Sequence, residues 1–488
     1  MVNERNMIDW VLSIPAEDRC TEFKRLGDKD VSVSKIVQTL VAMANTDGGF
    51  IFCGIDDPEK TKLKGLNRVY GIEENLEIFD DIGREIVKIV PPLAILWPPL
   101  KIEIEKGKTI GIISVPKAGE HIHAINDKVY VRLEKGNKIL TPAEIIKYSY
   151  ARGFIKADRE LVDVDFDLLD TEVFHGWRRL RKIQTDNLKD VLFHTGLAAK
   201  DERGVLKPTR AAVLLFALYP HTLMDTKSSI RVYQYEGTIE KIGNVPNLIG
   251  KPKTIEGPLI KLIEEAQEYV LTLLQAGITI PSSGFINKYR IPARAVKEAI
   301  TNAVIHRDYF IKRDIEINIY EDRVEIVNAG LFSYNITPSN IGFVRADGYR
   351  NDLLVKHLRE FPDPPNLDRN EGVRAMREEM AQSNLYPPVY VTYPIFKDAV
   401  CCVLINAKKA SEWDKVYSYL SKKSKYVSNQ EVRDIIGNTD TVKVSRLLKK
   451  WADKGLLIKI DTGSKKLSKY RLPSGEMVDF LFADPKSK

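Results

Sequence analysis

MANTDGGFIFCGIDD, residues 43–57, decides the fold of the amino-terminal part of the chain. It opens inside an amphipathic helix, SKIVQTLVAMAN at 34–45, whose apolar residues recur at helical spacing. FIFCGI at 50–55 has the length and composition of a short buried strand. The two glycines between them permit the positive φ of a sharp helix-to-strand turn. We expect this turn to be structural, and a phosphate-binding loop is the alternative.

Further strands flank this stretch. KIEIEKGKTIGIISVP at 101–116 and KVYVRLEKGN at 128–137 are strand-like, and the first contains a hairpin turn at Lys106-Gly107. A second unit begins with the helical segment PARAVKEAITNAVIHRDY at 292–309 and continues in strands. The pattern predicts an α/β and α+β multidomain protein. The predicted parts are a first module at 1–155, a connector at 156–284 that contributes to the unit after it, that unit at 285–408, a small helical domain at 411–474 and a tail at 475–488.

The composition is that of an ordinary globular protein, with 44% hydrophobic and 29% charged residues among 488. Four cysteines without a CxxC pair and seven histidines argue against a disulfide framework or a structural zinc site. No apolar run approaches the ~20 residues of a membrane span. We therefore expect a cytoplasmic protein that does not enter a membrane.

Carboxylates gather near the start of the chain. Glu17 and Glu22 are followed by Lys24, and the strand FIFCGI runs into Asp56 and Asp57. Carboxylates from neighbouring strand ends suit a hard divalent cation such as Mg²⁺ or Mn²⁺, which polarises a phosphodiester and activates water. A lysine beside them would stabilise charge on the phosphate. The alternative from these residues alone is a solvated acidic loop.

The first module resembles the AlbA_2 module of Schlafen proteins. The resemblance is carried by EFKR at 22–25, by MANTDGGFIFCGIDD and by the closing VYVRLEKGNKILTPAEI at 129–145. The resemblance covers roughly residues 10–155. It implies that Glu17, Glu22 and Asp57 form an acidic, metal-dependent nuclease site. Many relatives with this module are described as regulators, and Schlafen RNA cleavage uses two such lobes. Because this chain holds one copy, the resemblance implies a homodimer.

The helical segment at 292–309 places Glu298, Asn302 and His306 at i, i+4 and i+8, along one face of an otherwise apolar helix. Polar groups aligned in this way need partners when they are buried. A solvated helix face is the alternative that the spacing leaves open.

The second unit resembles the GHKL-type ATPase-like module of the HATPase_c_4 variety, over roughly 285–408. The resemblance is carried by the segments EAITNAVIHRDY, DIEINIYEDRVEIVNAGLF, RND and NEGVRAM. The resemblance implies an ATP site in which Asn302 binds Mg²⁺ and Glu298 activates water. The turn from Asn328 to Gly330 stands where these proteins read adenine. The segment FPDPPNLDRNEG at 361–372 is a predicted lid, and Gly372 is its glycine. His306 completes the candidate nucleotide-binding set.

The sequence pattern of the carboxy-terminal region predicts a winged helix-turn-helix. Helices are expected at 430–436 and 441–454, with a wing hairpin at 456–460 and 469–472. Residues 442–471 hold ten basic residues against two acids, a net charge of +8, which exceeds the +7 of the whole chain. This charge favours nucleic acid, with protein contact as the alternative. The candidate contacts are Lys443, Arg446 and Lys450 on the second helix and Lys465 and Lys466 on the wing.

Two functions fit these modules. The first is a nucleic-acid-binding protein with an ATP-binding module that acts as a DNA-binding regulator. The alternative is a metal-dependent, Schlafen-like nuclease for RNA or DNA that ATP gates.

Overall fold

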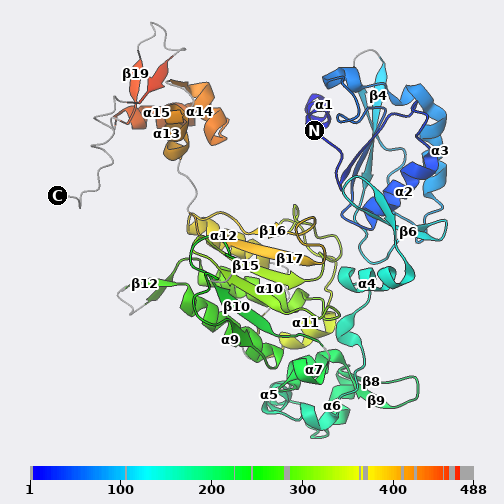
Figure 1. Cartoon of the computed structure of the whole chain (residues 1–488), viewed down its shortest axis with the longest axis vertical. Helices are drawn as coiled ribbons and strands as arrows, with labels where there is room; N and C mark the ends of the chain where they lie inside the picture. The colour runs from blue at the N-terminus through cyan, green and yellow to red at the C-terminus, as the bar shows by residue number, and fades with distance from the viewer. Residues whose placement is uncertain are drawn as a thin grey trace. The chain divides into compact units, whose positions relative to one another are not determined.

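The computed structural model divides the chain into two compact units, Met1–Ala407 and Lys408–Lys488. Figure 1 shows their helices and strands. The structure describes residues 4–104, 107–224, 226–242, 246–279, 286–361, 364–365, 372–407, 412–422, 426–453, 456–460 and 468–472.

The first module is built on a four-stranded sheet of order β1-β2-β4-β3, in which β1 pairs with β2 in parallel and the other pairs are antiparallel. A smaller sheet, β5-β6-β7, follows. The strands predicted at 101–116 correspond to β3 and β4, and residue 106 of the hairpin turn predicted between them lies outside the described residues. The strand predicted at 128–137 is shorter than expected, because β6 ends at Arg132 and a new strand, β7, begins at Asn137. The elements are α1 (Glu4–Ser13), β1 (Thr21–Lys24), α2 (Val33–Ala44), β2 (Gly49–Cys53), η1 (Gly65–Arg68), η2 (Ile72–Asn75), α3 (Leu76–Ile86), β3 (Leu100–Ile104), β4 (Lys108–Val115), β5 (Ala124–Ile125), β6 (Lys128–Arg132), β7 (Asn137–Ile139) and α4 (Pro142–Arg152).

Helix α2 forms the centre of this module's core. The Ser32 side chain accepts the backbone N–H of Lys35 at its start, and eight of its residues are buried. The turn that follows needs glycine. Gly49 has a φ of 142°, and a Cβ there would lie 2.0 Å from the carbonyl oxygen of Cys20. The structural interpretation of the turn is therefore supported, and its Asn45 amide donates to the carbonyls of His123 and Tyr130 at 2.8 Å.

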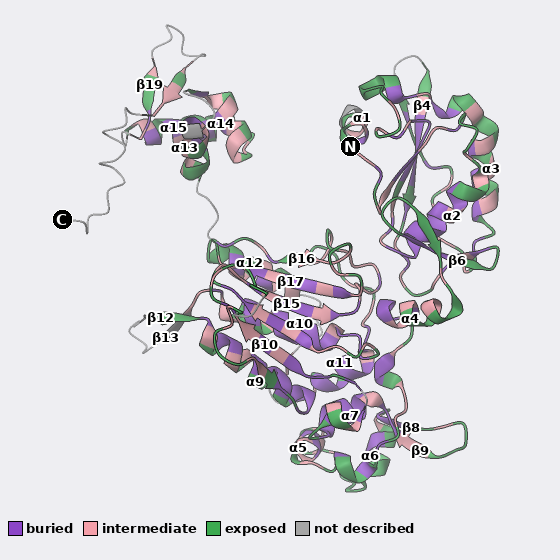
Figure 2. Ribbon diagram, in the orientation of Figure 1, coloured by how far each residue is buried: buried purple, intermediate pink, exposed green. Residues whose placement is uncertain are grey.

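A small helical region connects the first module to the next sheet. The apolar residues 211–216 lie in helix α7, and all but the first residue of this helix are buried. Figure 2 shows this helix largely in the buried colour. The elements are η3 (Ala157–Arg159), η4 (Phe166–Leu169), α5 (Glu172–Leu180), α6 (Leu188–His194), β8 (Ala198–Lys200), β9 (Leu206–Pro208), α7 (Arg210–Phe216) and α8 (Pro220–Leu223).

A six-stranded sheet of order β11-β10-β14-β15-β17-β16 dominates the rest of this unit. Strand β10, from the predicted connector, pairs in parallel with β14, so the connector supplies part of this sheet. Helix α10 packs between α9 and α12 and contacts β15. The elements are β10 (Ile230–Gln234), β11 (Lys253–Ile255), α9 (Leu259–Leu273), β12 (Gln275–Thr279), β13 (Ile286–Tyr289), α10 (Ala293–His306), β14 (Ile315–Ile319), β15 (Arg323–Ala329), α11 (Asp352–Leu358), α12 (Gly372–Gln382), β16 (Val389–Val391) and β17 (Ala399–Ile405).

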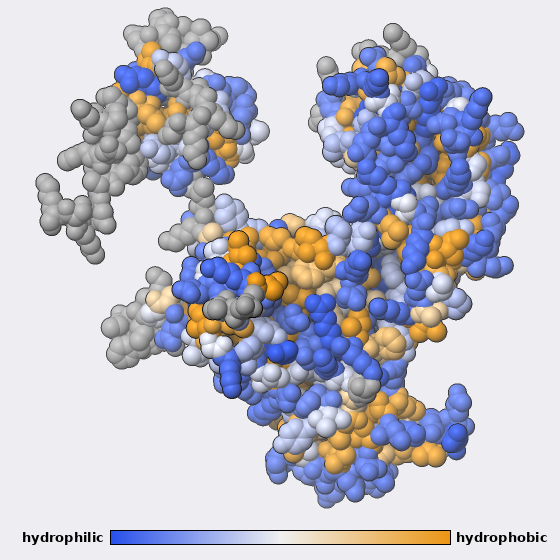
Figure 3. All heavy atoms as spheres, viewed as in Figure 1, coloured by the Kyte–Doolittle hydropathy of each residue, from blue (hydrophilic) through white to orange (hydrophobic). Residues whose placement is uncertain are grey.

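The two faces of this sheet differ. Successive side chains of a strand point to opposite sides of the sheet. The side that faces the helices is buried, and it includes Ile317, Ile326 and Leu404 from three neighbouring strands. The other face is partly exposed at β16 and β17. Figure 3 shows apolar side chains over these strands, where Val389 is 43% and the nearby Ile395 is 74% exposed. The helix-covered face is therefore the one that can hold an enclosed site.

The second unit is small, and its described residues form three helices and a three-stranded sheet of order β18-β20-β19. The helix predicted at 430–436 begins one residue earlier and ends at Ile436, where Gly437, with a φ of 70°, forms the cap. The predicted end of the next helix at 454 lies outside the described residues, which follow it to Asp453. The elements are α13 (Glu412–Lys422), β18 (Val427–Ser428), α14 (Asn429–Ile436), α15 (Thr441–Asp453), β19 (Ile458–Ile460) and β20 (Lys469–Arg471).

Of the helices that the structure describes, none combines the length and the apolar character that crossing a bilayer requires.

Candidate functional sites

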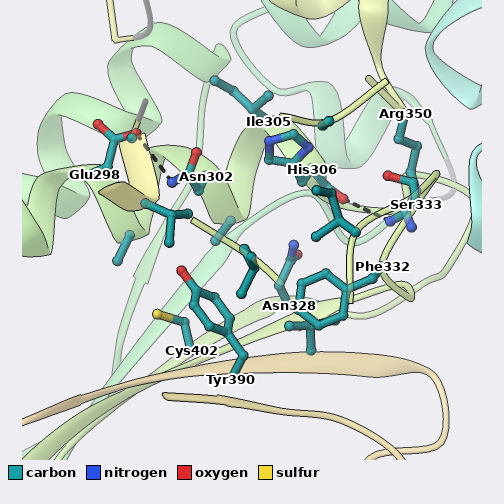
Figure 4. A pocket seen from close by; sticks show the side chains of 18 of the residues that line it. Glu298, Asn302, Ile305, His306, Asn328, Phe332, Ser333, Arg350, Tyr390 and Cys402 are labelled. Atoms are coloured by element: carbon teal, nitrogen blue, oxygen red, sulfur yellow. Dashed lines mark hydrogen bonds between the residues drawn. The ribbon is translucent and has the colours of Figure 1, made fainter. Parts of the chain in front are cut away.

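A cavity of about 490 Å³ lies between helix α10, the start of α12 and the helix-covered face of the sheet. Figure 4 shows side chains from α10 on one side of it and from β15, β16 and β17 on the other. All six residues predicted to bind nucleotide line it: Glu298, Asn302, His306, Asn328, Gly330 and Gly372. The structure therefore brings these six residues together around one cavity.

Glu298 and Asn302 meet on one face of α10, as their spacing predicts. The amide nitrogen of Asn302 donates to Oε1 of Glu298 at 3.3 Å, so the amide oxygen takes no part in this contact. Burial raises the pKa of Glu298. Gly372, at the start of α12, leaves room for this carboxylate, because a Cβ on it would lie 1.7 Å from Oε1 of Glu298. The predicted lid before it lies mostly outside the described residues.

Asn328, at the end of β15, brings a polar side chain to the wall of the cavity. Its Oδ1 is buried and has no hydrogen-bond partner. Buried polar atoms without partners are rare and costly, so each one calls for an explanation. An acceptor in this place can pair with the amino group of a purine base. Two residues on, Gly330 has a φ of 111°, and a Cβ there would lie 2.1 Å from Nη1 of Arg350.

His306 closes one end of the cavity. Its ring stacks on Tyr349 with the centroids 5.7 Å apart. Burial and the charge of Arg350 lower the pKa of His306 to about 4, so the imidazole is neutral at neutral pH. A neutral, stacked ring is suited to an aromatic or hydrogen-bonding contact rather than to neutralising phosphate.

Sequence reasoning missed part of the cavity wall. Tyr390 and Cys402, opposed on β16 and β17, point into the cavity from below Asn328 in Figure 4. Burial raises the pKa of the Cys402 thiol to about 12, so it stays protonated. The CC pair at 401–402 was visible in the sequence, but only strand alternation identifies Cys402 as the member that faces the helices.

The acidic residues of the first module are buried, at 4% exposure for Glu17 and 6% for Asp57. Both carboxylates lie 3.5 Å from one atom, Nζ of Lys60. Burial, and then the charge of Glu22, raise the pKa of Glu17. Lys60, which the sequence did not single out, therefore lies where a cation can contact two predicted site residues.

Glu22, the third carboxylate, is held by two other cations. One oxygen accepts from Lys24 and the other from Arg132, which is 3% exposed. The described residues contain no cluster of three or more acidic, histidine or cysteine side chains arranged to hold a metal. The predicted metal set of Glu17, Glu22 and Asp57 is therefore not found among the described residues, where Lys60 contacts the first and third carboxylates and Lys24 and Arg132 contact the second.

The three basic residues predicted on α15 lie on its exposed side. Lys443, Arg446 and Lys450 are exposed, while Val444 and Leu448 on the opposite side are buried. The predicted wing residues Lys465 and Lys466 lie outside the described residues.

Two family models match the chain. Residues 17–141 match the Schlafen AlbA_2 model, and residues 312–395 match the HATPase_c_4 model, which is described as the C-terminal part of a putative ATP-dependent DNA helicase recG. No curated protein matches the chain.

One solved structure aligns over nearly the whole length. It is the DIP2311 protein from Corynebacterium diphtheriae, and the alignment covers 99% of this chain and 98% of that one, at 15% identity and a TM-score of 0.41. A likeness at this score supports no conclusion about this chain. The two domain matches agree with the two resemblances seen in the sequence: this is a nucleic-acid-associated protein of the ATP-binding type, with a Schlafen-type AlbA_2 domain and an HATPase_c_4 domain.

Proposed function

We propose that this protein is a DNA-binding regulator whose hold on nucleic acid depends on ATP. The observation that carries the proposal is the cavity beside α10, where Asn328 offers a buried acceptor without a partner. ATP fits this site if its base contacts Asn328 and its Mg²⁺ contacts the amide oxygen of Asn302. Glu298 is positioned beside Asn302 to accept a proton from water.

The carboxy-terminal unit supplies the DNA contact in this proposal. We infer that it is a winged helix-turn-helix, with α15 as the recognition helix in the major groove. Its exposed face carries Lys443, Arg446 and Lys450. Lysine and arginine chiefly contact phosphates, so this face accounts for affinity more than for sequence specificity.

Lys117 supports the dependence on ATP, because it joins the AlbA_2 domain to the wall of the nucleotide cavity. Its Nζ donates to the carbonyls of Phe332 at 3.1 Å and Ile336 at 2.6 Å, and both of these residues line the cavity. The side chain is 5% exposed and lies 3.7 Å from Asp47. Burial, and then the charge of Arg152, lower the pKa of Lys117 well below its usual value.

The turn after α2, which contains Asp47, is also connected to the acidic residues. Thr46, beside Asp47, accepts the backbone N–H of Arg132 at 2.8 Å, and the Arg132 guanidinium binds Glu22. Arg350 forms a second connection, since it lines the cavity and donates to the carbonyls of Ala151 and Leu331. We infer that a nucleotide which displaces the cavity wall affects Glu22 through the Lys117 hydrogen bonds, the Lys117–Asp47 ion pair and the contacts of Arg132.

This coupling predicts the effect of Lys117→Met. We expect Mg²⁺-ATP to change the affinity of the wild-type chain for nucleic acid at least about fivefold, the lower end of usual coupling energies. Lys117→Met keeps the apolar stem but removes both carbonyl contacts, so this change should fall to less than about twofold. Fluorescence anisotropy with a labelled oligonucleotide, with and without Mg²⁺-ATP, measures it. Lys138→Met, an exposed lysine in the same domain, is the control. An affinity that ATP leaves unchanged in the wild type contradicts the proposal.

A metal-dependent nuclease is the second candidate, and the shared contact of Glu17 and Asp57 with Lys60 favours it. A divalent cation in the place of that ammonium would have two carboxylate ligands. When bound, such a metal polarises phosphate and activates water. The candidate therefore needs Glu17 and Asp57 as ligands and Glu22 close to the same substrate.

For this candidate we expect Glu22→Ala and Asp57→Asn to lower cleavage of labelled RNA or DNA in Mn²⁺ by about 100-fold or more, the usual loss when a catalytic charge contact is removed. Glu120→Gln, which removes a carboxylate that is 74% exposed, should leave cleavage unchanged. Gel assays on tRNA, single-stranded DNA and duplex DNA measure the rate. If the purified wild type cleaves none of these, the nuclease candidate is wrong, and the regulator proposal is unaffected.

A further inference from the structure

Several polar side chains line the nucleotide cavity around Asn328. Asn328 is on β15, and Tyr390 and Cys402, on β16 and β17, lie below it in Figure 4. His306, at the end of α10, lies on the opposite side. Among the described residues that line the cavity, Glu298 is the only carboxylate, and Figure 4 shows it on α10, apart from Asn328. A base that contacts Asn328 therefore meets no negative charge from the cavity wall around it.

The titratable neighbours of Asn328 are neutral at neutral pH. Burial raises the pKa of Tyr390 well above its usual value and that of Cys402 to about 12, so both side chains keep their protons. His306 is unprotonated, because burial lowers its pKa to about 4. A phenol, a thiol and a neutral imidazole each carry a donor and an acceptor. These three groups therefore favour neither an amino group nor an oxo group on a base.

Arg350 is the cation on this side of the cavity. One terminal nitrogen of its guanidinium donates to the carbonyl of His306 at 2.8 Å, and the other donates to the carbonyls of Ala151 and Leu331. Both terminal nitrogens are thus engaged with the backbone. The choice between an amino and an oxo group on the base is left to Asn328.

The Asn328 amide can make either contact. It carries an acceptor, Oδ1, and a donor, Nδ2, and a half-turn of the last side-chain torsion exchanges their positions. With Oδ1 toward the base, it pairs with the amino group of a 6-aminopurine such as adenine. With Nδ2 toward the base, it pairs with the oxygen of a 6-oxopurine such as guanine. An aspartate in this place could make only the first of these contacts, because an ionised carboxylate has no donor.

We propose that the cavity accepts nucleotides of both purine classes, GTP as well as ATP, and that Asn328 is the specificity-determining residue. The inference rests on the proposed function, because it requires the base of a nucleotide to lie at Asn328. It extends that function, since the hold of this protein on nucleic acid would then respond to guanine as well as adenine nucleotides. The amino or oxo group of a pyrimidine lies closer to its ribose, so a pyrimidine nucleotide with Mg²⁺ at Asn302 does not reach Asn328.

Isothermal titration calorimetry of the full chain with the Mg²⁺ complexes of ATP, GTP, ITP and CTP tests the inference. ITP has the 6-oxo group of GTP without its 2-amino group, so it isolates the contact at position 6. Asn328→Asp keeps the acceptor and removes the donor. Asn318→Asp makes the same change on β14, on the face of the sheet away from the cavity, and is the control.

We expect the wild type to bind ATP, GTP and ITP with affinities within about tenfold of one another, and CTP more than about tenfold more weakly than ATP. In Asn328→Asp the 6-oxo group would be buried without a donor. The affinities for GTP and ITP should therefore fall about 30-fold relative to that for ATP. Asn318→Asp should leave this ratio within about twofold of the wild type. Because the ratio compares ligands of one protein, a change in the fraction folded does not alter it.

The possible results separate this inference from the proposed function. A wild type that binds ATP, but binds GTP and ITP more than about tenfold more weakly, overturns the inference and leaves the proposed ATP site intact. An affinity for CTP within about tenfold of that for ATP overturns it too, and so does a ratio of ATP to GTP affinity that Asn328→Asp leaves unchanged. If the wild type binds none of the four nucleotides, the proposed function fails as well.

Discussion

Changing Lys443, Arg446 and Lys450 together to glutamine should lower the affinity of the full chain for duplex DNA by about 100-fold at moderate salt. The three side chains are exposed on one face of α15, and the buried Val444 and Leu448 on the other face hold the helix in place. Each phosphate contact that is lost also reduces counterion release, so the slope of log affinity against log salt should fall by about three. Anisotropy titrations at several salt concentrations give both quantities.

A matched triple variant tests whether the effect is local. Lys241, Lys251 and Lys261 are exposed lysines of the larger unit, and changing them to glutamine removes the same net charge. We expect this control to bind DNA within about twofold of the wild type. If both triple variants lose affinity equally, the net charge of the protein drives binding and α15 is not a recognition helix. Thermal unfolding of the smaller unit should not change, because substitutions of exposed side chains cost little stability.

Local patterns in the sequence predicted the elements that carry the candidate sites. The apolar spacing of residues 34–45 predicted α2, and the strands expected after the helical segment at 292–309 are β14 and β15. The spacing of Glu298 and Asn302 also predicted their contact, because residues four apart on a helix are neighbours. Each of these predictions depends on residues that are close in the chain, where backbone geometry alone fixes the result.

Contacts between distant residues could not be predicted in the same way. Arg132 binds Glu22 from 110 residues away, and Lys117 reaches the carbonyl of Ile336 across 219 residues. Only the tertiary fold brings them together. The sequence did contain a signal for Arg132, because it is a charged residue at the end of an apolar strand. Its neighbours at 129–131 on β6 are buried. A buried cation needs a partner, but the sequence does not say which carboxylate provides it.

Replacing Asn328 by leucine should weaken ATP binding and stabilise the protein without ligand. Leucine has nearly the same shape as asparagine but no acceptor, so the amino group of the base would be buried without a partner. That costs about 2 kcal/mol, or about 30-fold in affinity. In the free protein the same change removes the unpartnered Oδ1. The free energy of unfolding should therefore rise by about 1 kcal/mol. Isothermal titration calorimetry with ATP and urea unfolding measure the two effects.

Opposite signs for stability and binding distinguish a ligand-binding role from a structural one. If Asn328 has a purely structural role, Asn328→Leu lowers the free energy of unfolding. The apparent affinity for ATP then falls only in proportion to the fraction of protein that is unfolded. Asn328→Asp keeps an acceptor, and we expect it to bind ATP within about threefold of the wild type. Asn318→Leu, on the partly exposed face of the same sheet, controls for the added apolar surface. If Asn328→Leu leaves the affinity for ATP unchanged, Asn328 does not contact the base of the nucleotide. The proposed ATP site would then depend on the contacts of α10 alone.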